Sequence, residues 1–139
     1  MEAHAPTPYL DSAALRAIAQ RSATAGCKYC RTLSTLCWEA MPAGFSESQL
    51  VRVGTLRRES PESEPTLDEY HPDGTRYGSS NAPIAANYFP YNLCDVWACK
   101  RCQRAFLRYT EYGGYYVQQR VRLLDQALIV DPAVGGVDG

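Results

Sequence analysis

The residues best suited to chemistry in this 139-residue sequence are cysteines, four of which form two C-x2-C pairs, Cys27–Cys30 and Cys99–Cys102. A tight turn with this spacing directs two sulfurs at one point, and its backbone amides offset the charge of the thiolates. Two such turns complete the tetrahedral four-thiolate shell that is typical of a structural Zn²⁺. The spacing therefore predicts one structural Zn²⁺ with no open position for a substrate, held by Cys27, Cys30, Cys99 and Cys102. A four-thiolate shell also accepts iron, so the sequence leaves the choice between zinc and iron open.

The remaining two cysteines, Cys37 and Cys94, are expected to be small buried apolar residues, because free cysteine is among the most buried residue types. Two alternatives remain: either thiol could replace a ligand of the metal, or the two could pair if they were oxidised. A redox interpretation takes Cys27 and Cys30 as a dithiol of glutaredoxin type. That chemistry needs a strand before the pair and the first thiolate at a helix N-terminus. Here a helix is expected before the pair, which favours the metal.

Cysteine usage also bears on the compartment of the protein. Residues 1–10 contain neither a basic segment nor an apolar core, so they do not resemble a secretory signal. We therefore expect a cytoplasmic protein, because clustered thiols in a reducing compartment usually bind metal. No apolar run approaches the roughly 20 residues that span a bilayer, so no membrane partner is expected.

The composition fits one domain over residues 1–139, with 45% hydrophobic residues, 21% charged residues and a formal net charge of -1. The apolar fraction is too high for a disordered chain, and the balanced charge argues against a basic coat for nucleic acid. The two histidines, His4 and His71, are not paired in sequence with a nucleophile. The sequence also lacks a phosphate-binding glycine loop and an H-E-x-x-H motif. We therefore do not expect an enzyme.

Three stretches outside the cysteine pairs have readable patterns. Residues 11–21 predict a helix, capped by Asp11 or Ser12 and carrying apolar residues on one face. The segment 46–58 combines the spacing of a capping box with the alternation of a strand, so helix or strand stays open there. Residues 59–73 contain six acids, three prolines and no Lys or Arg, which predicts an acidic loop or arm inserted between the two cysteine pairs.

The clearest predicted element is a β-hairpin. Residues 105–112 and 115–124 alternate and are rich in aromatic and β-branched residues, and Gly113-Gly114 between them suits a two-residue turn. This register places Tyr112 opposite Tyr115. One face is then expected to pack on a core and contains Phe106, Thr110, Tyr112, Tyr115, Val117 and Val121. The other face contains Tyr109, Glu111, Tyr116, Arg120 and Arg122.

Residues 97–109, WACKRCQRAFLRY, resemble the second knuckle of zinc-ribbon proteins, where C-x2-C leads into a hairpin strand that carries an aromatic residue. The resemblance implies that this cysteine pair ligates metal and that Phe106 packs beneath it. Gln103 stands where such knuckles usually have Gly. Residues 69–116 are also similar to uncharacterised bacterial proteins, and this resemblance assigns no particular activity to the chain. The expected fold is an α+β or mainly β single small domain with an N-terminal helix, zinc-ribbon-like knuckles and a C-terminal β-hairpin.

Charge and aromatic residues concentrate between residues 99 and 122, where six Lys or Arg residues stand against one Glu, with tyrosines between them. This composition is typical of protein-binding hot spots, but also of surfaces that bind single-stranded nucleic acid. A third interpretation is that the acidic segment 59–73 folds over these cations and neutralises them. We favour a protein partner, as for an adaptor or an immunity-type module, with nucleic acid as the alternative. The predicted partner-binding residues are Arg108, Tyr109, Tyr116, Arg120 and Arg122.

Overall fold

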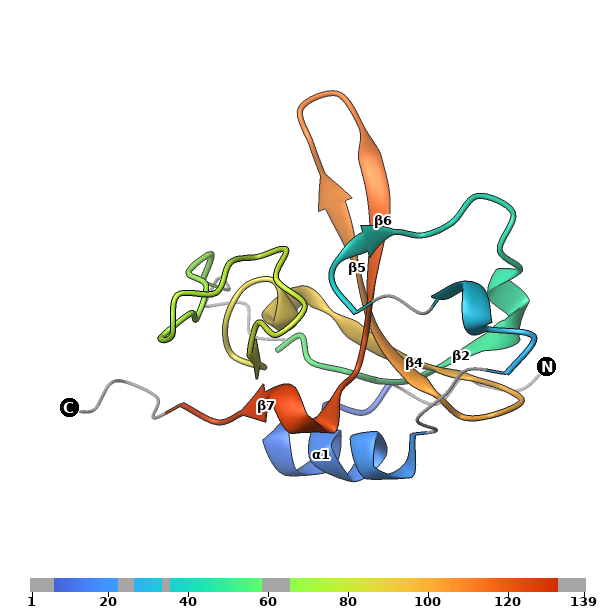
Figure 1. The fold of residues 1–139 in the computed structure, drawn as a ribbon, viewed down its shortest axis with the longest axis horizontal. Coiled ribbons are helices and arrows are strands. Elements are labelled where there is room, and N and C mark those ends of the chain that lie inside the picture. Colours follow the sequence, from blue (N-terminus) through green and yellow to red (C-terminus); the bar gives the residue numbers. More distant parts are fainter. Residues whose placement is uncertain (1–6, 23–26, 34–35, 59–65, 133–139) are drawn as a thin grey trace.

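The computed structural model describes residues 7–22, 27–33, 36–58 and 66–132. Its centre is a five-stranded antiparallel sheet in the order β1-β6-β5-β4-β2 (Figure 1). These strands are β1 (Glu39–Ala40), β2 (Leu50–Thr55), β4 (Asp95–Cys99), β5 (Ala105–Tyr112) and β6 (Val117–Leu123). A small parallel pair is formed by β3 (Ile84–Ala85) and β7 (Ile129–Val130). Together with helix α1 (Ser12–Arg21), these elements confirm the predicted α+β or mainly β class.

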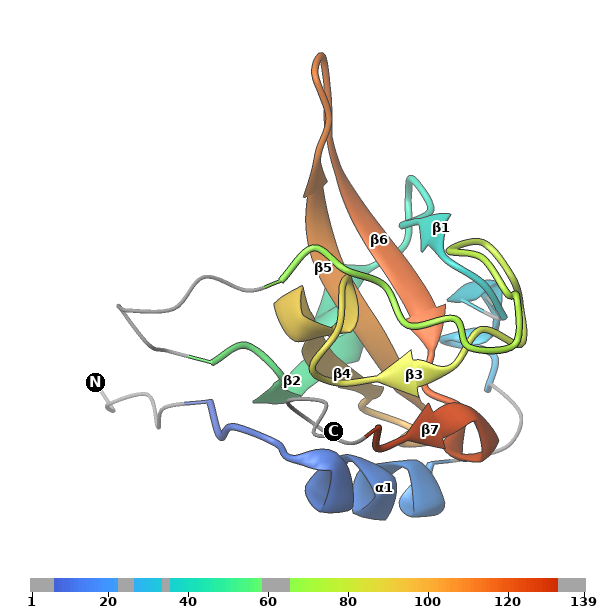
Figure 2. The same cartoon turned by 90° about the vertical axis from the view of Figure 1, so that its left-hand side faces the viewer.

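Helix α1 begins where the sequence places its cap. The side chain of Asp11 accepts a hydrogen bond from the backbone N–H of Ala14, with an oxygen–nitrogen distance of 2.8 Å. Leu15 and Ala19, four residues apart, are both buried, as the predicted apolar face requires. The helix packs beside β7 and the short 3₁₀ turn that precedes this strand (Figure 2).

The sheet carries apolar side chains on both faces, because neighbouring residues of β5 point in opposite directions. Phe106 joins a smaller cluster that includes cysteines, which we call the cysteine-side core. Leu107 joins a larger cluster on the opposite face, which we call the main core. The buried residues of the cysteine-side core are Cys30, Leu33, Leu50, Cys99, Phe106 and Val121. The main core includes Leu15, Trp38, Leu56, Tyr91, Val96, Leu107 and Tyr109 among its buried residues.

The β5–β6 hairpin exists, but its predicted two-residue turn is wrong. Tyr112 pairs with Val117, so the loop comprises residues 113–116 and the register lies two positions from the predicted one. The backbone N–H of Gly113 donates to the carbonyl of Tyr116 at 2.8 Å, and the ring of Tyr116 lies over this glycine. A Cβ at position 113 would stand 2.4 Å from that ring, so any other residue there would displace the ring of Tyr116. Because the slip is two positions, every strand side chain keeps its predicted face.

The ambiguous segment 46–58 contains a 3₁₀ turn, Glu47–Gln49, followed directly by strand β2. Of the predicted acidic segment, residues 59–65 lie outside the described residues, and residues 66–73 form neither helix nor strand. His71 belongs to this part of the chain and is partnered on both sides of its ring. Its Nε2 lies 2.7 Å from a carboxylate oxygen of Glu69, and its Nδ1 lies 2.7 Å from the hydroxyl oxygen of Thr75.

Candidate metal centre

The first knuckle, Cys27–Cys30, is a turn closed by its own backbone. The N–H groups of Cys30 and Arg31 both donate to the carbonyl of Cys27, at 3.1 and 2.9 Å. The chain then continues into a 3₁₀ turn, Arg31–Leu33, whose last side chain is fully buried. This anchor in the cysteine-side core holds the knuckle against the sheet.

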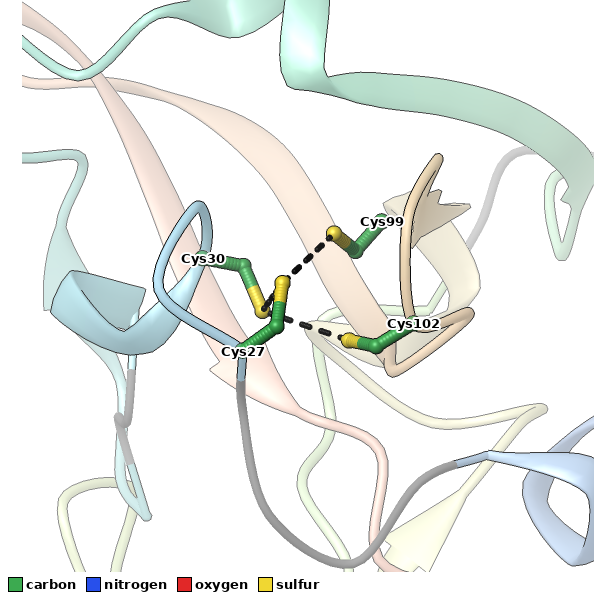
Figure 3. A group of neighbouring side chains, drawn as sticks. All are labelled: Cys27, Cys30, Cys99 and Cys102. Carbon is green, nitrogen blue, oxygen red and sulfur yellow. Dashed lines mark hydrogen bonds between the residues drawn. The ribbon is translucent and has the colours of Figure 1, made fainter.

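The second knuckle, Cys99–Cys102, forms the connection between strands β4 and β5. The N–H of Cys99 donates to the carbonyl of Arg104 at 2.9 Å, and the N–H of Gln103 donates to the carbonyl of Cys99 at 2.8 Å. The sheet therefore fixes the second knuckle directly. Figure 3 shows the two knuckles facing each other with all four thiols directed into the space between them.

The spacing of the four sulfurs suits one tetrahedral ion. The Sγ–Sγ distances are 3.9 Å for Cys27–Cys30, 3.7 Å for Cys27–Cys99 and 3.5 Å for Cys30–Cys102, and all four sulfurs lie within 4.8 Å of one another. A tetrahedral shell with metal–sulfur bonds of roughly 2.3 Å has sulfur–sulfur edges of roughly 3.8 Å. A disulfide would require roughly 2.05 Å. The four cysteines are therefore positioned to hold a metal ion.

The electrostatics of the cluster also suit a cation. Burial alone would raise the pKa of Cys27, but hydrogen bonds from the backbone N–H of Tyr29 and from the other three thiols lower this pKa to about 7. Burial and the neighbouring sulfurs raise the pKa of Cys30 well above its ordinary value. Without a cation, one sulfur therefore ionises near neutral pH while a buried one keeps its proton. A bound metal ion would release that proton and stabilise four thiolates together.

The sulfurs differ in their exposure to solvent. Cys30 and Cys99 are buried in the cysteine-side core, whereas Cys27 and Cys102 are partly exposed. Phe106 is fully buried in the same cluster, which is where the zinc-ribbon resemblance expects it. The inner half of the site is thus enclosed by apolar side chains, and its outer half faces the surface.

Gln103 has a backbone conformation that usually requires glycine. Its φ is 66°, and no other non-glycine residue of the described ranges has a positive φ. This is the position at which zinc-ribbon knuckles usually have Gly. In the second knuckle a side chain therefore stands at a position whose backbone conformation favours glycine.

The other two cysteines lie apart from the cluster. Cys94 is fully buried in the main core, where its thiol donates to the carbonyl of Pro90 at 3.3 Å and burial raises its pKa. This confirms the prediction of a small buried residue. Cys37 is only half-buried, and neither thiol belongs to the four-sulfur group. All six cysteines are free thiols.

Three of the five predicted partner-binding side chains lie inside the fold. Tyr109 is buried in the main core. Arg108 is buried as well, donates to a carboxylate oxygen of Glu47 at 2.6 Å and lies over the ring of Trp97. Arg122 is 0% exposed and is the largest fully buried side chain among the described residues. In this structure these three side chains are not available to a partner.

The guanidinium of Arg122 is held by neutral groups. It donates to the hydroxyl of Tyr91 and to the carbonyls of Ser80 and Ala82, the last two at 3.2 and 2.9 Å. None of the ion pairs between described residues includes it. Arg122 thus ties the 80–82 loop and Tyr91 to strand β6, a structural role that its charge did not reveal in the sequence.

The other two predicted partner-binding residues remain near the surface. Tyr116 is 48% exposed, and its hydroxyl donates to Glu111 at 3.4 Å. Arg120 is half-buried and also donates to Glu111, at 2.8 Å. Tyr116 lies in the hairpin loop, at the end that projects from the body of the protein (Figures 1 and 2), whereas Arg120 lies further back, where β6 pairs with β1.

The projecting tip also exposes three residues that were predicted to face the core: Tyr112, Tyr115 and Val117. That expectation is wrong because strands β5 and β6 extend beyond the strands that pair with them on either side. Strand β4 pairs with β5 only as far as Arg108, and the pairing of β1 with β6 reaches no further toward the tip than Arg120. The alternation of apolar and polar residues in the hairpin does not indicate where the pairing with β4 and β1 ends.

No protein-family model, no curated protein and no solved structure matches this chain. Among the described residues, none forms a helix of the length and apolar character needed to cross a membrane.

Proposed function

We propose that this chain is a small zinc-stabilised module that binds another protein through the tip of its β5–β6 hairpin. One structural Zn²⁺ is held by Cys27, Cys30, Cys99 and Cys102, in a zinc-ribbon-like arrangement of two knuckles. The four-sulfur group supports the metal, because its spacing suits a closed shell, and the exposed tyrosines of the hairpin tip support the binding of a protein. A closed shell stabilises a fold and offers no position to a substrate.

The metal would join two parts of the chain that are far apart in sequence. Cys30 and Cys102, 72 positions apart, lie with their sulfurs 3.5 Å from each other. The second knuckle continues directly into β5, which leads to the hairpin tip. The ion would therefore stabilise the base of the strand whose other end presents the binding surface.

The hairpin tip has the composition of a protein-binding surface. Tyr112 and Val117 are 78% and 63% exposed, and Tyr115 is fully exposed. Tyrosine contributes a large contact area at a small cost in conformational entropy, which is why it is enriched at hot spots. The backbone N–H of Gly113 donates to the carbonyl of Tyr116, a bond that closes the loop between the two strands.

The two alternatives receive less support. A nucleic-acid surface along the hairpin would need its arginines exposed, yet Arg104, Arg108 and Arg122 are buried. Glutaredoxin-type chemistry needs its first thiol at a helix N-terminus, whereas the first knuckle is followed by a three-residue 3₁₀ turn. Six free thiols fit a reducing compartment, so the cytoplasm is the proposed location.

The test is affinity capture from the source cell with zinc-loaded protein. The wild type should retain one protein partner in stoichiometric amount. The double variant Tyr112→Ser, Tyr115→Ser should lose this partner while keeping its metal and its melting temperature. Tyr9→Ser is the matched control, because Tyr9 is a partly exposed tyrosine outside the hairpin. Recovery of nucleic acid without protein, or equal capture by the tip variant, would contradict the proposal.

A further inference from the structure

The two knuckles bring cations together that are far apart in sequence. Lys28 and Tyr29 form the tip of the first knuckle, and Lys100 and Arg101 form the tip of the second. All four side chains are exposed. The Arg101 guanidinium carbon lies 4.6 Å from the centroid of the Tyr29 ring, and Lys28 Nζ lies 5.2 Å from it. We call these four residues the knuckle face.

The cations of the knuckle face have no Asp or Glu beside them in sequence, although a Zn²⁺ with four thiolates would itself carry a net charge of about -2 and offset part of their charge. The sequence contains no Asp or Glu in residues 22–37 or 99–104. The ion pairs between described residues use cations from other parts of the fold and none from the knuckle face. The Tyr29 ring makes cation–π contacts with both Arg101 and Lys28, which favour two cations at one ring.

We propose that the knuckle face binds single-stranded nucleic acid, with its three cations on successive phosphates and an unpaired base stacked on the Arg101–Tyr29 pair. Guanidinium planes and tyrosine rings are the surfaces on which unpaired bases stack. An acidic protein would instead require apolar contact area at the centre of its interface, and the knuckle face offers a single ring. A duplex is disfavoured because short turns, not a helix or a ribbon, project from this face.

This site is separate from the proposed protein-binding tip. The second knuckle adjoins the first residue of β5, and the hairpin tip follows its last residue, Tyr112. The eight residues of β5 place the two sites about 26 Å apart along the strand. A protein at the tip and a nucleic acid at the knuckle face would therefore not exclude each other.

The experiment is a fluorescence anisotropy titration of zinc-loaded protein with a dye-labelled oligouridylate at two salt concentrations. Three phosphate contacts predict that raising the salt from about 50 to about 200 mM weakens binding about 20-fold, since each contact on a single strand contributes about -0.7 to the logarithmic slope. The variants Lys28→Gln, Lys100→Gln and Arg101→Gln should each reduce that slope by about 0.7. Tyr29→Ala should weaken binding at least about 5-fold through lost stacking.

Arg58→Gln is the matched control, because Arg58 is also an exposed arginine that lies over a tyrosine, Tyr9, with 5.8 Å between guanidinium carbon and ring centroid. It should bind like the wild type, and so should the tip variant Tyr112→Ser, Tyr115→Ser. Metal content and melting temperature are measured for every variant.

Four results would overturn the inference. The first would be failure of the zinc-loaded protein to bind the oligonucleotide at low salt. The second would be weakening of binding by Arg58→Gln to the same extent as by Arg101→Gln. The third would be equally tight binding of an oligoglutamate peptide at the same residues, which would assign the site to acidic proteins. The fourth would be loss of metal from the knuckle variants with no binding of the oligonucleotide by the wild type or any variant, which would mean that the cations only offset the charge of the thiolates. None of these results bears on capture of a protein by the hairpin tip.

Discussion

Replacing Cys99 by serine should remove the metal and a large part of the stability of the fold. A bound ion would join Cys30 to Cys102 across 72 positions of the chain. By the chain-entropy relation for a cross-link, closing a loop of this length stabilises the folded state by about 4 kcal/mol. Domains of ordinary stability unfold at a cost of about 5–15 kcal/mol, so this contribution is a large fraction of the total. For 139 residues it corresponds to a fall in melting temperature of roughly 14 °C.

The assay is thermal unfolding followed by circular dichroism, with and without a zinc chelator. The wild type should lose about as much stability on chelation as Cys99→Ser loses by substitution, and the variant should not respond to the chelator. Cys37→Ala is the matched control, because this half-buried thiol lies outside the four-sulfur group and should keep both metal and chelator sensitivity. A chelator-insensitive wild type, or equal destabilisation by the two substitutions, would refute the reasoning.

Three further predictions concern the fold around the site. Gln103→Gly should raise the free energy of unfolding by about 0.5–1 kcal/mol, because glycine tolerates the positive φ of this position, and denaturant titration would show a loss if the strain is absent. Asp11→Ala should lower the free energy of unfolding by about 1 kcal/mol through loss of the helix cap, with an unchanged denaturation midpoint as the contrary result. Burial raises the pKa of both Tyr91 and Tyr109, so the folded protein holds these protons more tightly than the unfolded chain does. The free energy of unfolding should therefore fall above about pH 10, by about 1.4 kcal/mol per pH unit for each phenol. Denaturant titration at several alkaline pH values measures this fall, which should be smaller in Tyr109→Phe. An unchanged pH dependence in that variant would contradict the prediction.

The features that sequence predicted well are local ones. Asp11 caps helix α1 through the next turn of the chain, and the C-x2-C spacing defines each knuckle within four residues. The convergence of the two knuckles on one point followed from the chemistry of thiolates, without any knowledge of the sheet between them. The hairpin faces were also predicted, because alternation is preserved when the register slips by two positions.

The features that sequence missed depend on contacts between distant segments. The hairpin loop has four residues and is closed by a hydrogen bond from Gly113 to the carbonyl of Tyr116, which dipeptide preferences do not report. The burial of Arg122 depends on carbonyl groups of residues 80 and 82, in a loop without regular structure. The exposure of Tyr112 depends on where β4 stops pairing with β5, and short neighbouring strands do not reveal their ends in sequence.

The most direct test of the central claim is elemental analysis of the native protein, purified without added metal and combined with X-ray absorption at the metal edge. The account predicts one equivalent of zinc per chain, coordinated by four sulfurs at roughly 2.3 Å, and loss of that zinc in Cys99→Ser but not in Cys37→Ala. Less than half an equivalent of zinc and iron together, or a shell that contains nitrogen or oxygen ligands in place of cysteine sulfur, would contradict it.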